Sequence, residues 1–218
     1  MIFLNVKLKI MNKLTYLFLL IVIIGCSGGD SNNSGNDTNV VDNPIYLDVN
    51  GITIKSREWG RTGDTGVVNG VEYTIVGQGI LRRMINDKED VTRVCTSRIG
   101  NMDNFFKEEV DFNQDIGSWD VSNVTSMTGM FAVSGFNQDI GNWDVSNVTS
   151  MNSMFGSSRY FNQDIGNWDV SNVKKMWFMF GYATSFNQDL SSWNVSNVTS
   201  YNSFSDGTPQ WTLPKPNF

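Results

Sequence analysis

A single phrase of about 25 residues recurs four times in this chain, and this recurrence constrains the fold more than any other feature. The steps between successive copies are 24, 25 and 25 residues. Residues 96–106 align with residues 121–131 at a step of 25, which adds a degenerate copy upstream. Such a period is typical of repeat proteins in which every unit covers the apolar side of its neighbour. The full copies begin at Phe112, Phe136, Phe161 and Phe186.

The apolar spacing changes along each unit. In the first full copy, residues 119–121 alternate apolar and polar side chains, which is the period of a β-strand. From Val124 the spacing becomes three, through Met127 and Met130, and this is typical of one α-helical or 3₁₀ turn. Each unit is therefore predicted to hold one short strand, one helical turn and one loop.

We expect equivalent side chains of successive units to pack on one another and to form the core. Neighbouring extended segments lie about 4.8 Å apart, which brings such side chains into contact. An alternative role for the tryptophan row is stacking on sugar rings, since an indole combines an apolar face with a hydrogen-bond donor. The predicted core positions are Trp119, Trp143, Trp168, Trp193, Phe112, Phe136, Phe161, Phe186, Met130, Met154 and Met179.

These features together predict an α/β repeat solenoid, a leucine-rich-repeat-like stack of about five coils of 24–25 residues. We expect a small N-terminal cap of β-hairpins and a helix before it. Asn50-Gly51 and Asn69-Gly70 each separate two apolar runs, which favours hairpins, and residues 78–86 have helical apolar spacing. The predicted boundaries are 45–94 for the cap, 95–206 for the repeats and 207–218 for a C-terminal cap or tail.

The N-terminus has the pattern of an export signal. Three lysines precede an almost wholly apolar run at residues 14–24, which is short for a bilayer span. The run ends in Ile-Ile-Gly-Cys, which resembles a bacterial lipobox and implies that Cys26 carries lipid. An ordinary signal with an incidental cysteine is the alternative, and both Met1 and Met11 fit as initiator. The predicted segments are a lipoprotein signal peptide at 1–25 and a flexible Ser-, Gly- and Asn-rich tether at 26–44.

The repeated phrase FNQDIGNWDVSNVTSM, with Met-Phe shortly after it, resembles the repeat of the BspA-like leucine-rich-repeat surface proteins, also described as the DUF285 family. The upstream sequences GDTGVVNGVEYTIV and ILRRMINDKEDVTRVCTSRI are similar to the segment that commonly precedes those repeats. The resemblance covers residues 51–206. It implies a surface protein of bacteria or mycoplasmas that takes part in adhesion and cell-surface interaction.

Composition narrows the function further. The chain has no histidine, which excludes Ser-His-Asp and Cys-His catalysis and the usual zinc sites. Removal of residues 1–25 takes away three lysines and no acid, so the net charge becomes about −9, which disfavours nucleic acid as a partner. The repeated aspartates have equivalent surroundings and do not divide into acid and base, so we predict no enzyme, no cofactor and no metal. Calcium bound by the Asp and Asn rows is an alternative to local capping of bends.

We therefore predict a lipid-anchored protein of the bacterial cell envelope, on the outer membrane or cell surface, whose repeats bind a protein or matrix partner. The alternatives are a glycan-binding accessory of a polysaccharide system, and a structural or antigenically variable coat protein. Polar side chains on the expected strand side are predicted to form the binding face, namely Asp120, Ser122, Asp144, Ser146, Asp169 and Ser171.

Overall fold

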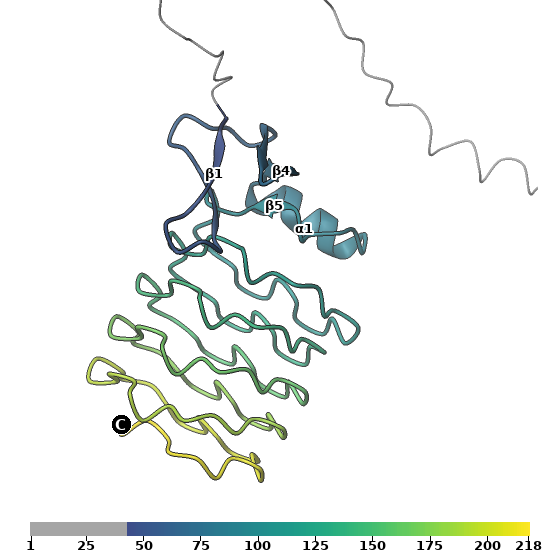
Figure 1. Ribbon diagram of the computed structural model, residues 1–218. Helices are drawn as coiled ribbons and strands as arrows, with labels where there is room; N and C mark the ends of the chain where they lie inside the picture. The colour runs from purple at the N-terminus through teal and green to yellow at the C-terminus, as the bar shows by residue number, and fades with distance from the viewer. Residues whose placement is uncertain (1–42) are drawn as a thin grey trace, which may run out of the picture. The chain divides into compact units, whose positions relative to one another are not determined.

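The computed structural model describes residues 43–218 (Figure 1). The predicted signal peptide, the lipidation of Cys26 and the tether up to residue 42 lie outside the described residues. All helices and strands of the described part fall between residues 45 and 95. Among the described residues, no helix combines the length and the apolar content that a membrane span needs.

Two β-hairpins open the described chain. β1 (Ile45–Leu47) pairs antiparallel with β2 (Ile54–Ser56), and β3 (Thr65–Val68) pairs antiparallel with β4 (Val71–Ile75). The Asn-Gly turn between β3 and β4 has positive φ at both residues, the type I′ geometry that these two residue types favour. Both Asn-Gly hairpins expected from the sequence are present.

A helix and a short strand connect the hairpins to the repeats. β5 (Val94–Cys95) lies parallel to β4, and α1 (Gln78–Asn86) buries Leu81 and Ile85 in the same apolar cluster as the repeat side chains. β2 also reaches the repeats, because the N–H of Ile54 donates to the carbonyl of Ser118 at 2.8 Å. The N-terminal elements are thus joined to the first full copy through both backbone and core.

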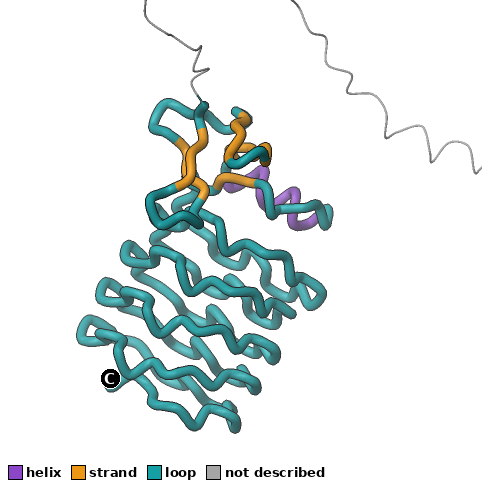
Figure 2. The backbone as a smooth tube through the Cα atoms, viewed as in Figure 1, coloured by secondary structure: helices purple, strands orange, loops and turns teal. Residues whose placement is uncertain are grey.

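The predicted α/β repeat solenoid of leucine-rich-repeat type is wrong. Beyond β5, the described residues contain no strand and no helix, and Figure 2 draws that whole region as loop. The expected strand around residue 120 fails because the chain turns on both sides of it. The N–H of Trp119 donates to Ile116 at 3.1 Å, and the N–H of Val124 donates to Val121 at 2.8 Å, so both bonds close tight local turns.

The expected helical turn in each unit fails for a different reason. Backbone N–H groups after Met127 alternate between two kinds of partner. Met130 donates to Met127 within its own turn at 3.2 Å, whereas Phe131 donates to Met154 of the next copy at 2.9 Å. A helix requires successive N–H groups to bond within the same segment. The apolar spacing of three therefore reflects consecutive tight turns and not a helix.

One short extended stretch per copy lies beside its equivalents in the neighbouring copies. We name the stretches 125–128, 149–152, 174–177 and 199–202 the ladder segments. Their backbones bond between copies, as in the donation from Met151 to Lys175 at 2.8 Å. In Figure 1 the copies are visible as successive layers. Parallel single-residue bridges join, in order, Asn101, Ser126, Ser150, Lys175 and Ser200.

The turns that follow the ladder segments contain two left-handed residues each, four positions apart. In this conformation the N–H of Val133 points to the next copy and donates to Gly156 at 2.9 Å, and Glu108, Ser157 and Tyr182 do the same in their own copies. Left-handed backbone costs a non-glycine residue about 1–2 kcal/mol, which the inter-copy bonds offset. The two sets are Asn104, Gly129, Ser153, Phe178 and Ser203, and Glu108, Val133, Ser157, Tyr182 and Gly207.

Equivalent apolar side chains of successive copies meet in the core. The predicted core positions are buried except for Phe112, which is half-buried. Phe155 stacks between Phe131 and Phe180, with ring centroids 5.6 and 5.5 Å away. The indole N–H of Trp143 donates to the carbonyl of Ile116 in the preceding copy at 3.2 Å. In the described part, no buried side-chain nitrogen or oxygen lacks a hydrogen-bond partner.

A substitution at Val133 tests the left-handed turns. Val133 is β-branched, 43% exposed and has φ of 58°, a conformation that asparagine tolerates far better. We expect Val133→Asn to raise the free energy of unfolding by about 1 kcal/mol, measured by chemical denaturation. Val110→Asn is the matched control, because Val110 is also an exposed valine but has no positive φ. A Val133→Asn protein no more stable than the control variant would contradict the left-handed assignment.

Candidate binding surfaces

The predicted binding residues lie in a row of tight bends, one bend per copy. Asp144 Oδ1 accepts the N–H of Ser146 at 3.1 Å and its hydroxyl at 2.6 Å. Asp169 Oδ1 accepts the N–H of Ser171 at 3.0 Å in the same way. Aspartate favours such local turns because its short side chain reaches the backbone two residues ahead. These four residues reach the surface, but one carboxylate oxygen of each aspartate already bonds within its bend.

Asp120 differs from its equivalents because it is buried. Its carboxylate accepts the hydroxyl of Ser97, and it also accepts the N–H of Ser122 at 3.1 Å and the Ser122 hydroxyl at 2.6 Å. These bonds join the first full copy to the degenerate copy that precedes it. The structure therefore brings together the bends at Asp144 and Asp169 on the surface and leaves Asp120 inside.

Local hydrogen bonds or burial explain why some side chains have a pKa that departs from its ordinary value. Hydrogen bonds from the side chain and then the backbone of Ser171 lower the pKa of Asp169 from its ordinary value, so this carboxylate is ionised at neutral pH. Burial raises the pKa of the Cys95 thiol. Because the thiolate is the reactive form, Cys95 is an inert core side chain and not a nucleophile.

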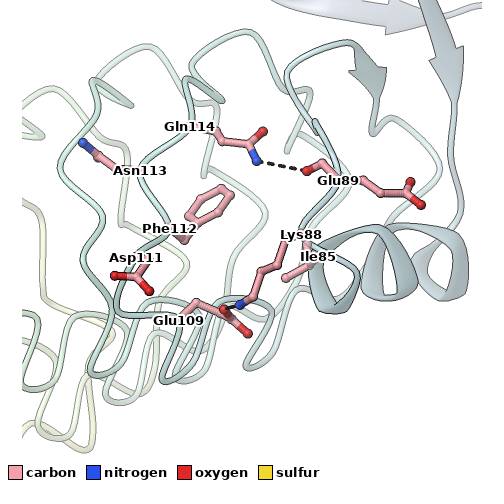
Figure 3. Close-up of a pocket in the computed structure, with 8 residues that line it drawn as sticks. All are labelled: Ile85, Lys88, Glu89, Glu109, Asp111, Phe112, Asn113 and Gln114. Atoms are coloured by element: carbon pink, nitrogen blue, oxygen red, sulfur yellow. Dashed lines mark hydrogen bonds and ion pairs between the residues drawn. The ribbon is translucent and has the colours of Figure 1, made fainter. Parts of the chain in front are cut away.

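A groove of about 500 Å³ separates the end of α1 and its following loop from the first full copy (Figure 3). Gln114 Nε2 reaches across it and donates to the carbonyl of Glu89 at 3.0 Å. Lys88 forms an ion pair with Glu109 on the other side of Phe112. Because these contacts connect the loop after α1 to the repeats, we interpret this groove as a structural junction.

A second groove, of about 480 Å³, lies beside β4 and the first two full copies. It is lined by Arg93 and by two of the repeated aspartates, Asp115 and Asp139. Each aspartate Oδ1 accepts the N–H of the glycine two residues ahead, at 3.0 and 2.8 Å. Within residues 43–218 there is no group of three or more carboxylate, thiol or imidazole side chains that could hold a metal ion. The aspartate rows thus form bends in this structure.

Sequence reasoning missed Trp177, an exposed tryptophan in the third ladder segment. Its side chain is 47% exposed, whereas the four tryptophans of the repeated phrase are buried and cannot stack on a sugar. A comparison of the copies, column by column, would have found it, because no other copy has an aromatic residue at this position. The equivalent residues are Asp103, Thr128, Asn152 and Asn202.

Trp177 belongs to a group of three aromatic side chains at the surface of the third full copy. Its ring centroid is 5.4 Å from that of Phe178, which in turn is 5.9 Å from that of Tyr182. Tyr182 is exposed and Phe178 is half-buried. We name these three residues the aromatic platform. Lys174 and Lys175 precede it in the same ladder segment, and both are exposed.

The comparisons with known proteins identify a family for the repeats. A family model described as "Mycoplasma protein of unknown function, DUF285" matches residues 78–156 and again residues 132–212. The two matches together span more than half of the chain, including α1, β5 and all the full copies. No curated protein and no solved structure matches the chain.

Proposed function

We propose that this chain, which belongs to the DUF285 family, is a lipid-anchored surface protein of the BspA-like kind whose repeats bind partners outside the cell. The proposed partners are proteins or polymers of a surrounding matrix. The proposed anchor is lipid on Cys26, which assigns the protein to the bacterial cell envelope, on the outer membrane or cell surface.

The proposal depends chiefly on one observation: the copies agree at their buried apolar positions and at their polar bends, whereas surface positions of the ladder segments change from copy to copy. Met154 and Phe155 have identical equivalents in the full copies before and after them. One such position is half-buried Thr128 in the first full copy, half-buried Asn152 in the second and exposed Trp177 in the third. A constant framework that carries changing side chains in its ladder segments suits recognition of a partner, because repeat proteins present extended faces of this kind.

The chemistry of the surface favours binding over catalysis. The repeated aspartates are held in equivalent bends by equivalent hydrogen bonds, so they have no division into a proton donor and a proton acceptor. The acidic net charge opposes nucleic acid, whose backbone requires a basic surface. Recognition through exposed polar and aromatic side chains agrees with both facts.

The anchor is supported by the N-terminal pattern of lysines, an apolar run and a Gly-Cys junction. Each buried methylene of an acyl chain contributes about 0.8 kcal/mol of membrane binding, so two chains hold a protein stably. We propose that the Ser-, Gly- and Asn-rich residues after Cys26 separate the lipid from the repeats.

A second candidate function, a glycan-binding accessory of a polysaccharide system, is favoured by the aromatic platform. Exposed indole and phenol rings offer the flat apolar faces on which sugar rings pack, together with polar edges for their hydroxyl groups. This candidate uses the same anchor and the same surface display.

The test combines lipid labelling with binding. We expect cells fed a clickable palmitate analogue to label the wild-type chain and not Cys26→Ser, and external protease to digest the protein on intact cells. Beads coated with the full-length chain in detergent micelles should capture matrix polymers or matrix proteins. An unlabelled protein, protected inside intact cells and inert toward every matrix preparation, would contradict the proposal. Labelled and surface-exposed protein with no ligand would favour a structural coat.

A further inference from the structure

We propose that the aromatic platform, together with Lys174 and Lys175, binds an anionic polysaccharide through stacking on its sugar rings and pairing with its carboxylates. This inference rests on the proposed function, since it requires the repeats to be displayed outside the cell. It goes further by assigning the ligand class and the residues. A polymer of uronic acids has the required chemistry.

The ladder segment directs a cation and an indole to the same side of the protein. Met176 is buried, so Lys175 and Trp177, its neighbours on either side, point outward together. Residues two apart in an extended chain lie about 6.6–6.8 Å from each other. A sugar ring packed on the indole would therefore have its carboxylate within reach of the long and flexible lysine side chain.

Asparagine occupies the position equivalent to Trp177 in the copies on both sides, and its amide can bond sugar hydroxyls. Asn152 of the preceding copy accepts the backbone N–H of Trp177 on its Oδ1 at 2.9 Å, which holds its amide at the backbone of Trp177. Asn202 of the following copy occupies the equivalent exposed position. An aromatic face between two amides offers stacking and hydrogen bonds to the same ligand.

At Phe178 the backbone under the platform accepts a larger conformational cost than the other copies do at the same position. Phe178 and Tyr182 both have φ of 56°, in the left-handed region that disfavours bulky residues. At the position of Phe178 the other copies have asparagine, glycine or serine, which suit this conformation better. Residues that break a local rule in this way occur preferentially at functional sites.

Glycines leave room for two of the three rings of the platform. A Cβ at Gly181 would come within 2.4 Å of the ring of Phe178, and one at Gly156 within 2.9 Å. A Cβ at Gly207 would come within 2.5 Å of the ring of Tyr182. The absence of these side chains lets both rings lie flat against the backbone.

The charges around the aromatic platform favour an anionic ligand. The ladder segments of the four full copies contain no acidic residue, and their only charged residues are Lys174 and Lys175. Neither lysine forms an ion pair with any residue in the described part. Asp206, whose carbonyl accepts the N–H of Tyr182, is an acidic residue beside the platform. The chain is acidic overall, so the attraction of a polyanion comes only from the two lysines close to it. Salt screens charges beyond a Debye length of about 8–10 Å at physiological ionic strength, so binding should weaken as salt is added.

Affinity electrophoresis of the full-length chain in detergent micelles tests the inference with three polymers. Alginate supplies uronic acid rings, dextran supplies neutral sugar rings, and polyglutamate supplies carboxylates without sugars. The variants copy residues of adjacent repeats, so they preserve the fold, which thermal unfolding verifies. They are Trp177→Asn, as at Asn152, and Lys174→Thr with Lys175→Ser, as at Thr149 and Ser150. Trp59→Ala, at an exposed tryptophan outside the repeats, is the matched control.

We expect alginate to retard the wild type most strongly. Trp177→Asn should weaken alginate binding about tenfold or more, the lysine variant should weaken it and reduce its dependence on salt, and Trp59→Ala should leave it unchanged. The inference is overturned if alginate does not bind, if Trp177→Asn binds as the wild type does, or if polyglutamate binds equally well. Failure with alginate, combined with capture of a matrix protein by the anchored chain, would overturn this inference and leave the proposed function standing.

Discussion

Replacement of Trp143 with alanine is expected to lower the free energy of unfolding by about 3–5 kcal/mol. Trp143 is 4% exposed and lies in the middle of the repeats, with copies on both sides. The substitution leaves a cavity against the ring of Phe131, whose centroid is 6.3 Å away, and leaves the carbonyl of Ile116 without its indole donor. Chemical denaturation of the full-length chain measures the difference.

Trp177→Ala is the matched control for Trp143→Ala, because it removes the same side chain from the surface of the next copy. We expect it to change the free energy of unfolding by no more than about 0.5 kcal/mol. Equal stability of the wild type and Trp143→Ala would mean that the repeated tryptophans are not core residues, and it would contradict the packing described above.

Gly135→Ala is expected to destabilise the chain by about 3 kcal/mol, although it adds only one methyl group. A Cβ at this position would lie 2.0 Å from the carbonyl oxygen of Val110 and 2.9 Å from its carbonyl carbon. Both atoms belong to the backbone of the preceding turn, which the N–H of Gly135 also contacts through Glu109 at 3.2 Å. The two turns must move apart, because no flexible side chain can absorb the clash. The change in thermal midpoint and in unfolding free energy measures this cost.

Gly79→Ala provides the control for that substitution. Gly79 lies in α1, and a Cβ there would meet no atom within 4 Å. Alanine stabilises a helix interior relative to glycine, so we expect this variant to be slightly more stable than the wild type. If Gly135→Ala proved as harmless as Gly79→Ala, the close approach of successive turns would be wrong.

The N-terminal elements could be predicted from local sequence because local interactions determine them. An Asn-Gly pair between two apolar runs has few alternatives to a hairpin, since these residues accept the positive φ that the turn requires. The apolar spacing of residues 78–86 likewise corresponds to α1. The period of the repeats and the burial of their large side chains also follow from the sequence alone.

The secondary structure of the repeats could not be predicted in the same way. Apolar residues three apart, as at Val124, Met127 and Met130, satisfy a helical turn and a series of tight turns equally well. The choice depends on where the N–H groups bond, and half of them bond to the next copy, about 25 residues away. Left-handed backbone at residues such as Val133 is opposed by propensity, so no local pattern reveals it.

The candidate binding surface could also be predicted only in part from the sequence. Polar residues such as Asp144 were natural predictions for a binding face because they repeat and face outward, yet the structure uses their oxygens to form bends. A polar residue that recurs from copy to copy in this chain therefore indicates a structural role, such as forming a bend. The residues that depart from the repeated phrase, Trp177 above all, are the ones left for recognition, and a search for agreement between copies overlooks them.

Hydrogen exchange of the tryptophan indole N–H groups, followed by ¹H–¹⁵N NMR, tests most directly whether each copy covers the next. The chain has seven tryptophans. The indole N–H groups of Trp143 and Trp168 donate to carbonyls of the preceding copy, at 3.2 and 3.1 Å, whereas Trp59 and Trp177 are exposed. We predict that the first pair exchanges only through global or near-global unfolding and that the second pair exchanges at once. Exchange of Trp143 and Trp168 as fast as that of Trp177 would contradict the account.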